Sequence, residues 1–166
     1  EVQPSLIKKI VNSRKEIVYE RVPLEHQKPL IDSDITDRVI EAMKYSTKLG
    51  GTASRADVPG FTEVGKTSTS EKIQGGVYAK NVHFSTFIGF APAKNAKIVI
   101  LVGIDEPAFR MLPGIGPTHY GGKCAAAVFA EIAKRILHYL GTPSDDPYGY
   151  PKGDPRYNEE KADMAK

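Results

Sequence analysis

The stretch GFTEVGKTSTSEK, residues 60–72, holds residue types that could perform two different kinds of chemistry. From Gly60 to Thr67 it fits GxxxxGK[ST], the pattern of a glycine-rich loop whose backbone and lysine cradle nucleotide phosphates. Alternatively, the run KTST at residues 66–69 lies on an edge strand and holds a carboxylate beside a reactive serine. The elements on either side of the stretch decide between the two interpretations.

The flanking sequence favours the edge strand. A phosphate loop leaves a buried strand and opens directly into a helix, because the helix N-terminus binds the phosphates. Residues 54–59, SRADVP, do not predict a buried strand. The β-branched and small polar residues of 67–76, with the glycine pair at the end, predict strand and turn. The apolar run 98–104, followed by Asp105 and Glu106, is a second feature in favour of the phosphate loop, since it is typical of a strand that ends in a magnesium-binding acid. A nucleotide hydrolase therefore stays as an alternative.

The order of predicted elements indicates an α+β fold in which helices pack on an antiparallel sheet. Hydrophobic periodicity and turn residues predict a hairpin, a helix, a meander of three strands and a second helix. The expected positions are residues 6–11 and 16–22 for the hairpin, Ser33 to Gly50 for the first helix, 62–73, 82–90 and 98–104 for the strands, and 123–140 for the second helix.

The same patterns predict which side chains are buried. In the second meander strand the row of Phe84, Ile88 and Phe90 is expected to face the core. The run 98–104 is apolar on both faces, as in a central strand. In the second helix, Ala125, Phe129, Ile132, Ala133, Ile136 and Leu140 should form the packed side.

Composition excludes several classes of protein. The 166 residues suggest one domain or a large piece of one, and the formal charge of +3 is spread along the chain, so nucleic-acid binding is not expected. The single cysteine, Cys124, rules out an intramolecular disulfide, and the four histidines lack metal-ligand spacing. His119 is expected in a surface loop. We expect no metal and no cofactor, and any membrane anchor to lie outside this chain.

Several spaced motifs resemble one known family. These are the hairpin PSLIKKI at 4–10, the segment GGT…GKTST between 50 and 69, the strand STFIGFAP at 85–92, the strand at 98–104 with Asp105, and the helix start YGG…AA…VF at 120–129. In this order they resemble the C-terminal part of the transpeptidase domain of class B penicillin-binding proteins, of the cell-division type. The resemblance implies a partial transpeptidase (β-lactamase-like) domain over residues 1–143, with residues 144–166 as an extended or disordered tail.

The resemblance also implies roles for four residues. Lys66 would supply positive charge, and the hydroxyls of Thr67 and Thr69 would bind the substrate carboxylate. The backbone N–H of Thr69 would form half of the oxyanion hole and so take part in catalysis. In the family, glycine normally occupies the third position of the box, where the ligand passes close to the strand. Ser68 departs from this, which puts the fit of substrate or drug in doubt.

The family's nucleophile is not expected within this chain. Ser5 and Lys8 match its Ser-x-x-Lys motif, but they fall in the predicted hairpin, where alternation points them to opposite faces. No Ser-x-Asn occurs anywhere. We therefore expect this chain alone to be inactive and to need an upstream half of the domain as its partner.

The resemblance implies a parent protein that is a peptidoglycan D,D-transpeptidase. It would be acylated on serine by stem peptides and by β-lactam antibiotics, and would work at the outer face of the inner membrane, in the periplasm. Cell-division proteins are further candidate partners. Besides the nucleotide hydrolase, a β-lactamase or carboxypeptidase relative and a non-catalytic cell-division binding module stay open.

Overall fold

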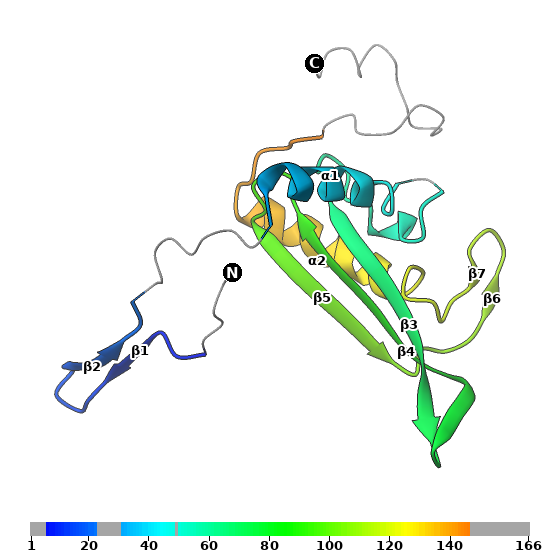
Figure 1. Ribbon diagram of the computed structural model, residues 1–166, viewed down its shortest axis with the longest axis horizontal. Helices are drawn as coiled ribbons and strands as arrows, with labels where there is room; N and C mark the ends of the chain where they lie inside the picture. The colour runs from blue at the N-terminus through cyan, green and yellow to red at the C-terminus, as the bar shows by residue number, and fades with distance from the viewer. Residues whose placement is uncertain (1–5, 23–30, 49, 147–166) are drawn as a thin grey trace, which may run out of the picture. The chain divides into compact units, whose positions relative to one another are not determined.

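The computed structural model describes residues 6–22, 31–48 and 50–146, and these divide into two compact units that meet in sequence between Arg38 and Val39. In the first unit β1 (Lys9–Val11) pairs antiparallel with β2 (Ile17–Glu20), as Figure 1 shows. The side-chain Oδ1 of Asn12 closes the turn by accepting from two backbone amides, those of Arg14 and Glu16. The predicted hairpin is confirmed, with shorter strands.

The first helix, α1 (Ser33–Lys44), begins where the sequence predicts but ends before the expected glycine pair. After it the chain turns, and the amide N–H of Ser46 donates to the carbonyl of Met43. This early end releases Ser46 and Thr47 from the helix, and both side chains then bond to backbone carbonyls at the start of the next strand.

The second unit is built on a three-stranded antiparallel sheet with the order β3-β4-β5. Its strands are β3 (Val64–Gln74), β4 (Val77–Ala91) and β5 (Ile98–Asp105), preceded by a short 3₁₀ turn, η1 (Ser54–Ala56). Gly75 and Gly76 both have positive φ and connect β3 to β4, as their types predict. The meander is confirmed. However, β4 is the central strand, whereas β5 lies at an edge of the sheet that the structure describes.

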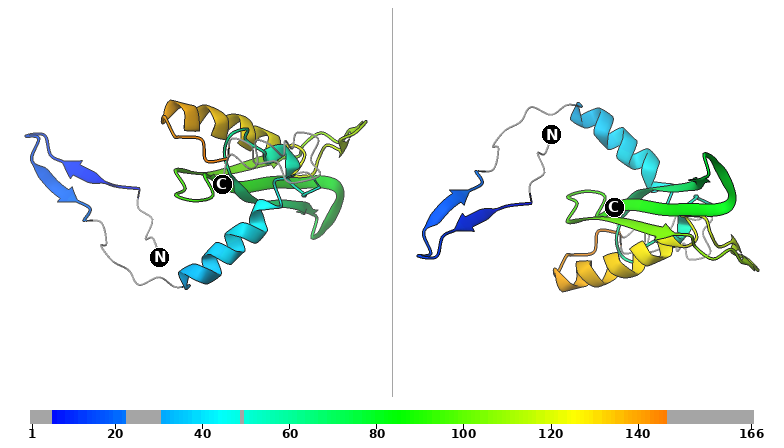
Figure 2. Two further views of the ribbon diagram at one scale, coloured as in Figure 1. Left: turned by 90° about the horizontal axis from the view of Figure 1, so that it is seen from above. Right: turned by 90° about the horizontal axis from the view of Figure 1, so that it is seen from below.

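The second helix, α2 (Ala125–Tyr139), covers one face of this sheet (Figures 1 and 2). The rings of Phe87 on β4 and Phe129 on α2 meet edge to face with centroids 4.8 Å apart, and Ala133 and Leu137 extend the contact along the helix. The segment before α2 is rich in glycine and proline and contains two very short paired strands, β6 (Met111–Leu112) and β7 (Gly116–Pro117). The α+β class is confirmed.

The predicted core row of β4 is wrong, although the alternation itself is right. Phe84 and Ile88 are 41% and 47% exposed, whereas Phe87 is fully buried. The covered row holds a single large apolar side chain, Phe87, among small and polar residues such as Ser85 and Gly89, so the more apolar row faces away from α2. The opposite face, which continues on β5 at Val99 and Leu101, is exposed in the part of the chain that the structure describes.

The packed side of α2 is also rotated from the prediction. Ile132 and Leu140 are exposed, while Leu137 is buried. Beyond the helix, residues 144–146 lie beside residues 60–62, and Gly60 and Asp146 form an antiparallel bridge. The rest of the predicted tail lies outside the described residues. Among those described, no helix is long and apolar enough to cross a membrane.

Candidate active site

The run KTST lies in the middle of a continuous strand. Gly65 pairs with Gly89 on β4, and a Cβ at Gly65 would stand 2.2 Å from the ring of Phe87, so the glycine lets two strands and a core ring pack together. β3 continues to Gln74 and leads into a turn, so no helix N-terminus follows the lysine. The phosphate-loop alternative is therefore not supported.

The four predicted site residues divide between the two faces of β3. Lys66 and Ser68 are exposed on the face that α2 does not cover. Thr67 and Thr69 are half-buried and point toward the glycine pair that precedes α2. The backbone N–H of Gly121 donates to the hydroxyl oxygen of Thr69 at 3.0 Å, so this hydroxyl already accepts one bond and keeps its own proton for another acceptor.

Hydrogen bonds along the outer edge of β3 show which backbone groups face away from β4. The hydroxyl of Ser46 donates to the carbonyl of Gly65, and the ammonium of Lys66 donates to the carbonyl of Thr67, both at 2.8 Å. In an antiparallel pair the N–H and C=O of one residue point to the same side, and this side alternates along the strand. The N–H groups of Thr67 and Thr69 therefore point to the open edge.

The glycine pair 121–122 fixes the distance between this strand and the start of α2. A Cβ at Gly121 would stand 2.3 Å from the carbonyl oxygen of Thr86 and 2.5 Å from that of Ser68. At Gly122 it would stand 1.9 Å from the carbonyl oxygen of Thr52. Only glycine allows the chain to come this close to the backbone of β3 and β4. The sequence showed the pair as a helix start, without this contact.

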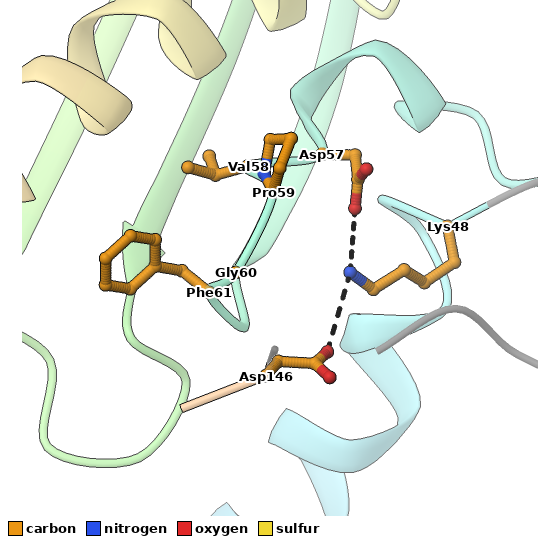
Figure 3. Close-up of a pocket in the computed structure, with 7 residues that line it drawn as sticks. All are labelled: Lys48, Asp57, Val58, Pro59, Gly60, Phe61 and Asp146. Atoms are coloured by element: carbon orange, nitrogen blue, oxygen red, sulfur yellow. Dashed lines mark hydrogen bonds and ion pairs between the residues drawn. The ribbon is translucent and has the colours of Figure 1, made fainter. Parts of the chain in front are cut away.

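A buried group of charges lies at the start of β3, and sequence reasoning missed it. Lys48 contacts Asp57 at 2.8 Å, Glu63 at 3.2 Å and Asp146 at 3.9 Å, and Figure 3 shows its ammonium between Asp57 and Asp146. Glu63 is fully buried, and its second oxygen accepts from the N–H of Val58. Lys48 follows a helix at a distance in sequence from all three acids, so no spacing rule links them.

The pKa values of this cluster follow from burial and charge. Burial raises the pKa of Glu63 to about 7, although the charge of Lys48 opposes the shift. For Lys48, burial lowers the pKa, but the carboxylates of Glu63 and Asp57 outweigh it and raise the pKa above its ordinary value. Glu63, a carboxyl whose pKa is strongly raised, therefore lies immediately before β3, the strand that carries the KTST run.

His119 is not in a surface loop as predicted. Its side chain is 6% exposed and stacks on His83 with ring centroids 4.5 Å apart, and Phe109 and Tyr120 contact its other sides. Neighbouring aromatic rings, which the sequence does not place together, explain the burial. His119 thus anchors the segment that brings Gly121 to β3. Within the described ranges, no group of three or more metal-ligating side chains could hold a metal ion.

Comparison with known proteins decides the family. The family model described as "Penicillin binding protein transpeptidase domain" matches residues 1–134. The chain belongs to this family. Among curated relatives, it is 38% identical over 120 residues to a probable peptidoglycan D,D-transpeptidase PenA of Neisseria flavescens, covering 72% of this chain and 28% of that protein. It is 33% identical over 127 residues to stage V sporulation protein D of Bacillus subtilis, covering 76% and 18%.

Solved structures of penicillin-binding proteins share the fold. Penicillin-binding protein 3 of Mycobacterium tuberculosis, in complex with aztreonam, aligns with a TM-score of 0.70 and 28% identity, over 87% of this chain and 32% of that one. This penicillin-binding protein segment thus spans less than a third of the length of the relatives named here. The predicted family and its α+β fold are confirmed, in a partial domain. Ser5, the serine of the chance Ser-x-x-Lys match, lies outside the described residues.

Proposed function

We propose that this chain is the substrate-binding part of a peptidoglycan D,D-transpeptidase. The observation that carries the proposal is the edge strand β3. It presents the exposed ammonium of Lys66 next to the outward-pointing N–H groups of Thr67 and Thr69. An ammonium beside free backbone donors suits an extended peptide that ends in a carboxylate. The family relationship supports the same reading, since relatives carry the name peptidoglycan D,D-transpeptidase.

The four residues receive distinct roles in this proposal. Lys66 neutralises the carboxylate of the substrate, and the N–H of Thr69 donates to the oxyanion that develops when a serine attacks the adjacent carbonyl. The hydroxyl of Thr69 is oriented by Gly121, so its proton is available to the carboxylate. Thr67 supplies a second outward N–H and a hydroxyl. Ser68 stands on the open face, where its hydroxymethyl group narrows the space for the ligand.

The remaining parts of the reaction come from outside this chain. The nucleophilic serine and its lysine base belong to the other half of the domain, which packs beside the open edge. The serine oxygen forms an ester with the carbonyl of the stem peptide, and the terminal residue leaves with the proton as a free amine. With β-lactams the opened ring stays attached as the ester. The protein acts on peptidoglycan outside the cytoplasm and is anchored to the membrane by sequence beyond this chain.

An acylation assay tests the proposal. The whole protein that contains this chain is incubated with a fluorescent penicillin, and intact mass and peptide mapping locate the label. We expect one adduct per protein, on a serine outside residues 1–166 of this chain. The matched control is the 166-residue chain alone, which should stay unlabelled. No adduct on the whole protein would contradict transpeptidase function and favour a non-catalytic binding module. Rapid release of hydrolysed drug would instead indicate a β-lactamase or carboxypeptidase.

A further inference from the structure

The segment after α2 forms hydrogen bonds with the residues just before β3, the strand that carries the KTST run. We call Ser144, Asp145 and Asp146 the C-terminal clasp. The backbone N–H of Asp146 donates to the carbonyl of Gly60 at 3.2 Å, and the hydroxyl of Ser144 donates to the same carbonyl. The clasp therefore forms a short antiparallel bridge with residues more than eighty positions earlier in the chain.

Thr62 is the junction through which the clasp reaches the sheet. Asp145 accepts two bonds from it, one from the backbone N–H at 2.8 Å and one from the hydroxyl. The N–H of Ala93, in the turn between β4 and β5, donates both to the hydroxyl oxygen and to the carbonyl of Thr62, each at 2.9 Å. A single residue thus ties together the clasp, the entry to β3 and the end of β4.

Lys48 makes a second link between the clasp and β3. Its ammonium contacts Asp57 and also Asp146 of the clasp (Figure 3). It also contacts Glu63 at the strand entry. The side chains of Lys48, Asp57 and Glu63 are each at most 10% exposed. Because a buried charge that loses its partner is strongly destabilised, the cluster resists separation of these segments.

The position of Thr62 and Glu63 determines the position of Lys66, because the chain between them is rigid. Val64 and Gly65 are both buried and paired with β4, so the strand is rigid between the junction and the lysine. Thr62 and Lys66 are only four residues apart, and displacement of reacting groups by about 1 Å can cost 10²-fold in rate. A shift at the junction would therefore move the ammonium and the N–H of Thr69 relative to the nucleophile.

We propose that the C-terminal clasp and Lys48 together form a positioning element for the substrate-binding strand, so that Asp145 and Lys48 act on the reaction through β3 without touching substrate. This inference rests on the proposed function. It assigns a role in the chemistry to a segment that follows α2 and that, among the described residues, acts on the proposed site only through Thr62, Glu63 and Lys48.

The test compares Asp145→Ala and Asp145→Asn in the whole protein with Asp37→Ala, an exposed aspartate on α1. Stopped-flow labelling with fluorescent penicillin gives two separate quantities, the fraction of protein that is labelled and the second-order acylation rate of that fraction. For Asp145→Ala we expect a normal labelled fraction and a rate reduced about tenfold. Asn keeps one acceptor for the N–H of Thr62, so Asp145→Asn should fall between Asp145→Ala and the wild type.

A double-mutant cycle with Thr62→Val identifies the route. If Asp145 acts through Thr62, the two substitutions together should slow acylation little more than either alone. A lower melting temperature and labelled fraction with an unchanged rate would overturn the inference, because Asp145 would then only stabilise the fold. Fully additive rate effects would overturn the route through Thr62. Failure of the wild-type protein to be labelled would refute the proposed function itself. The results for the Asp145 variants do not bear on that function, so the two failures can be told apart.

Discussion

Gly121 and Thr69 lie 52 residues apart in sequence, yet the backbone N–H of the first donates to the hydroxyl of the second at 3.0 Å. This bond joins the segment before α2 to the strand that carries the proposed site. It also sets the rotamer of Thr69, because the hydroxyl oxygen must face Gly121. The start of α2 is therefore part of the site's support and not only of the core.

Gly121→Ala should disable the site. The added Cβ would meet the carbonyl oxygens of Thr86 and Ser68 well inside contact distance, and backbone atoms cannot move aside as a side-chain tip can. We expect a loss of about 2–4 kcal/mol in the free energy of unfolding, measured by urea denaturation, and a matching loss of penicillin labelling. Ala127→Ser, on the outer side of α2, is the control. A stable, fully labelled Gly121→Ala variant would show that the close approach does not exist.

Lys66→Ala in the whole protein should slow acylation by a fluorescent penicillin about hundredfold, because the charge that holds the carboxylate is lost. Lys66→Arg keeps the charge and should retain part of the rate. The melting temperature should change little, since Lys66 is exposed and its bond to the carbonyl of Thr67 is local. Lys94→Ala, in the turn between β4 and β5, serves as the control. Equal rates for Lys66→Ala and Lys94→Ala would remove Lys66 from the site.

Ser68→Gly should speed acylation several-fold, because the substitution removes the side chain that stands on the open face beside Lys66. Glycine also weakens a strand by about 0.5–1 kcal/mol, so stability should fall slightly. Ser70→Gly, two residues on along the same face, carries the same backbone cost without clearing the ligand's path and is the matched control. If the two variants acylate alike, the effect belongs to the backbone and not to the site.

Glu63→Gln tests the buried cluster through the pH dependence of stability. Burial raises the pKa of Glu63 from 4.5 to about 7, so the folded protein holds this proton more tightly than the unfolded chain. Protonated Glu63 makes its full contribution to the free energy of unfolding below pH 4.5, and this contribution is lost as the pH rises through 7. Glutamine stays neutral, so the variant should gain about 3 kcal/mol relative to wild type between pH 4.5 and 8.5.

Urea denaturation at a series of pH values measures this difference, with Glu71→Gln on the exposed part of β3 as the control. A gain that does not change with pH, or a loss that grows above pH 7, would mean that Glu63 is held ionised by Lys48. The latter result would make the pair a net stabilising contact despite its burial.

The sequence predicted the order and type of the elements well, because Gly75–Gly76, the alternation in β4 and the periodicity of α2 are local signals. It failed at β4, where the more apolar row, with Phe84 and Ile88, faces away from α2. The local pattern favours that row, whereas the burial of Phe87 depends on where Phe129 lies in space. His119 likewise depends on a distant residue, because its burial requires the ring of His83 on β4.

The candidate site was predictable only in part. The KTST run and its place on a strand followed from residue types, and the family resemblance gave each residue its proposed role. The supporting contacts did not follow, because Asp145 reaches Thr62, and Lys48 reaches Glu63, across long separations with no spacing rule. Residues proposed to contact substrate form a motif within one short stretch of sequence. The residues that hold this stretch in place are distant in sequence, so only the folded structure identifies them.

The separation of 83 residues between Thr62 and Asp145 also orders events during synthesis. A ribosome adding about 5–20 residues per second needs roughly 4–17 s to travel from one to the other. Gly121 is added during this interval and the clasp only at its end, so the clasp is the last of these supports of β3 to be made. The contacts that support β3 are thus complete only after Asp145 has been added, so a chain cut short after β5 would emerge with its proposed recognition strand unsecured.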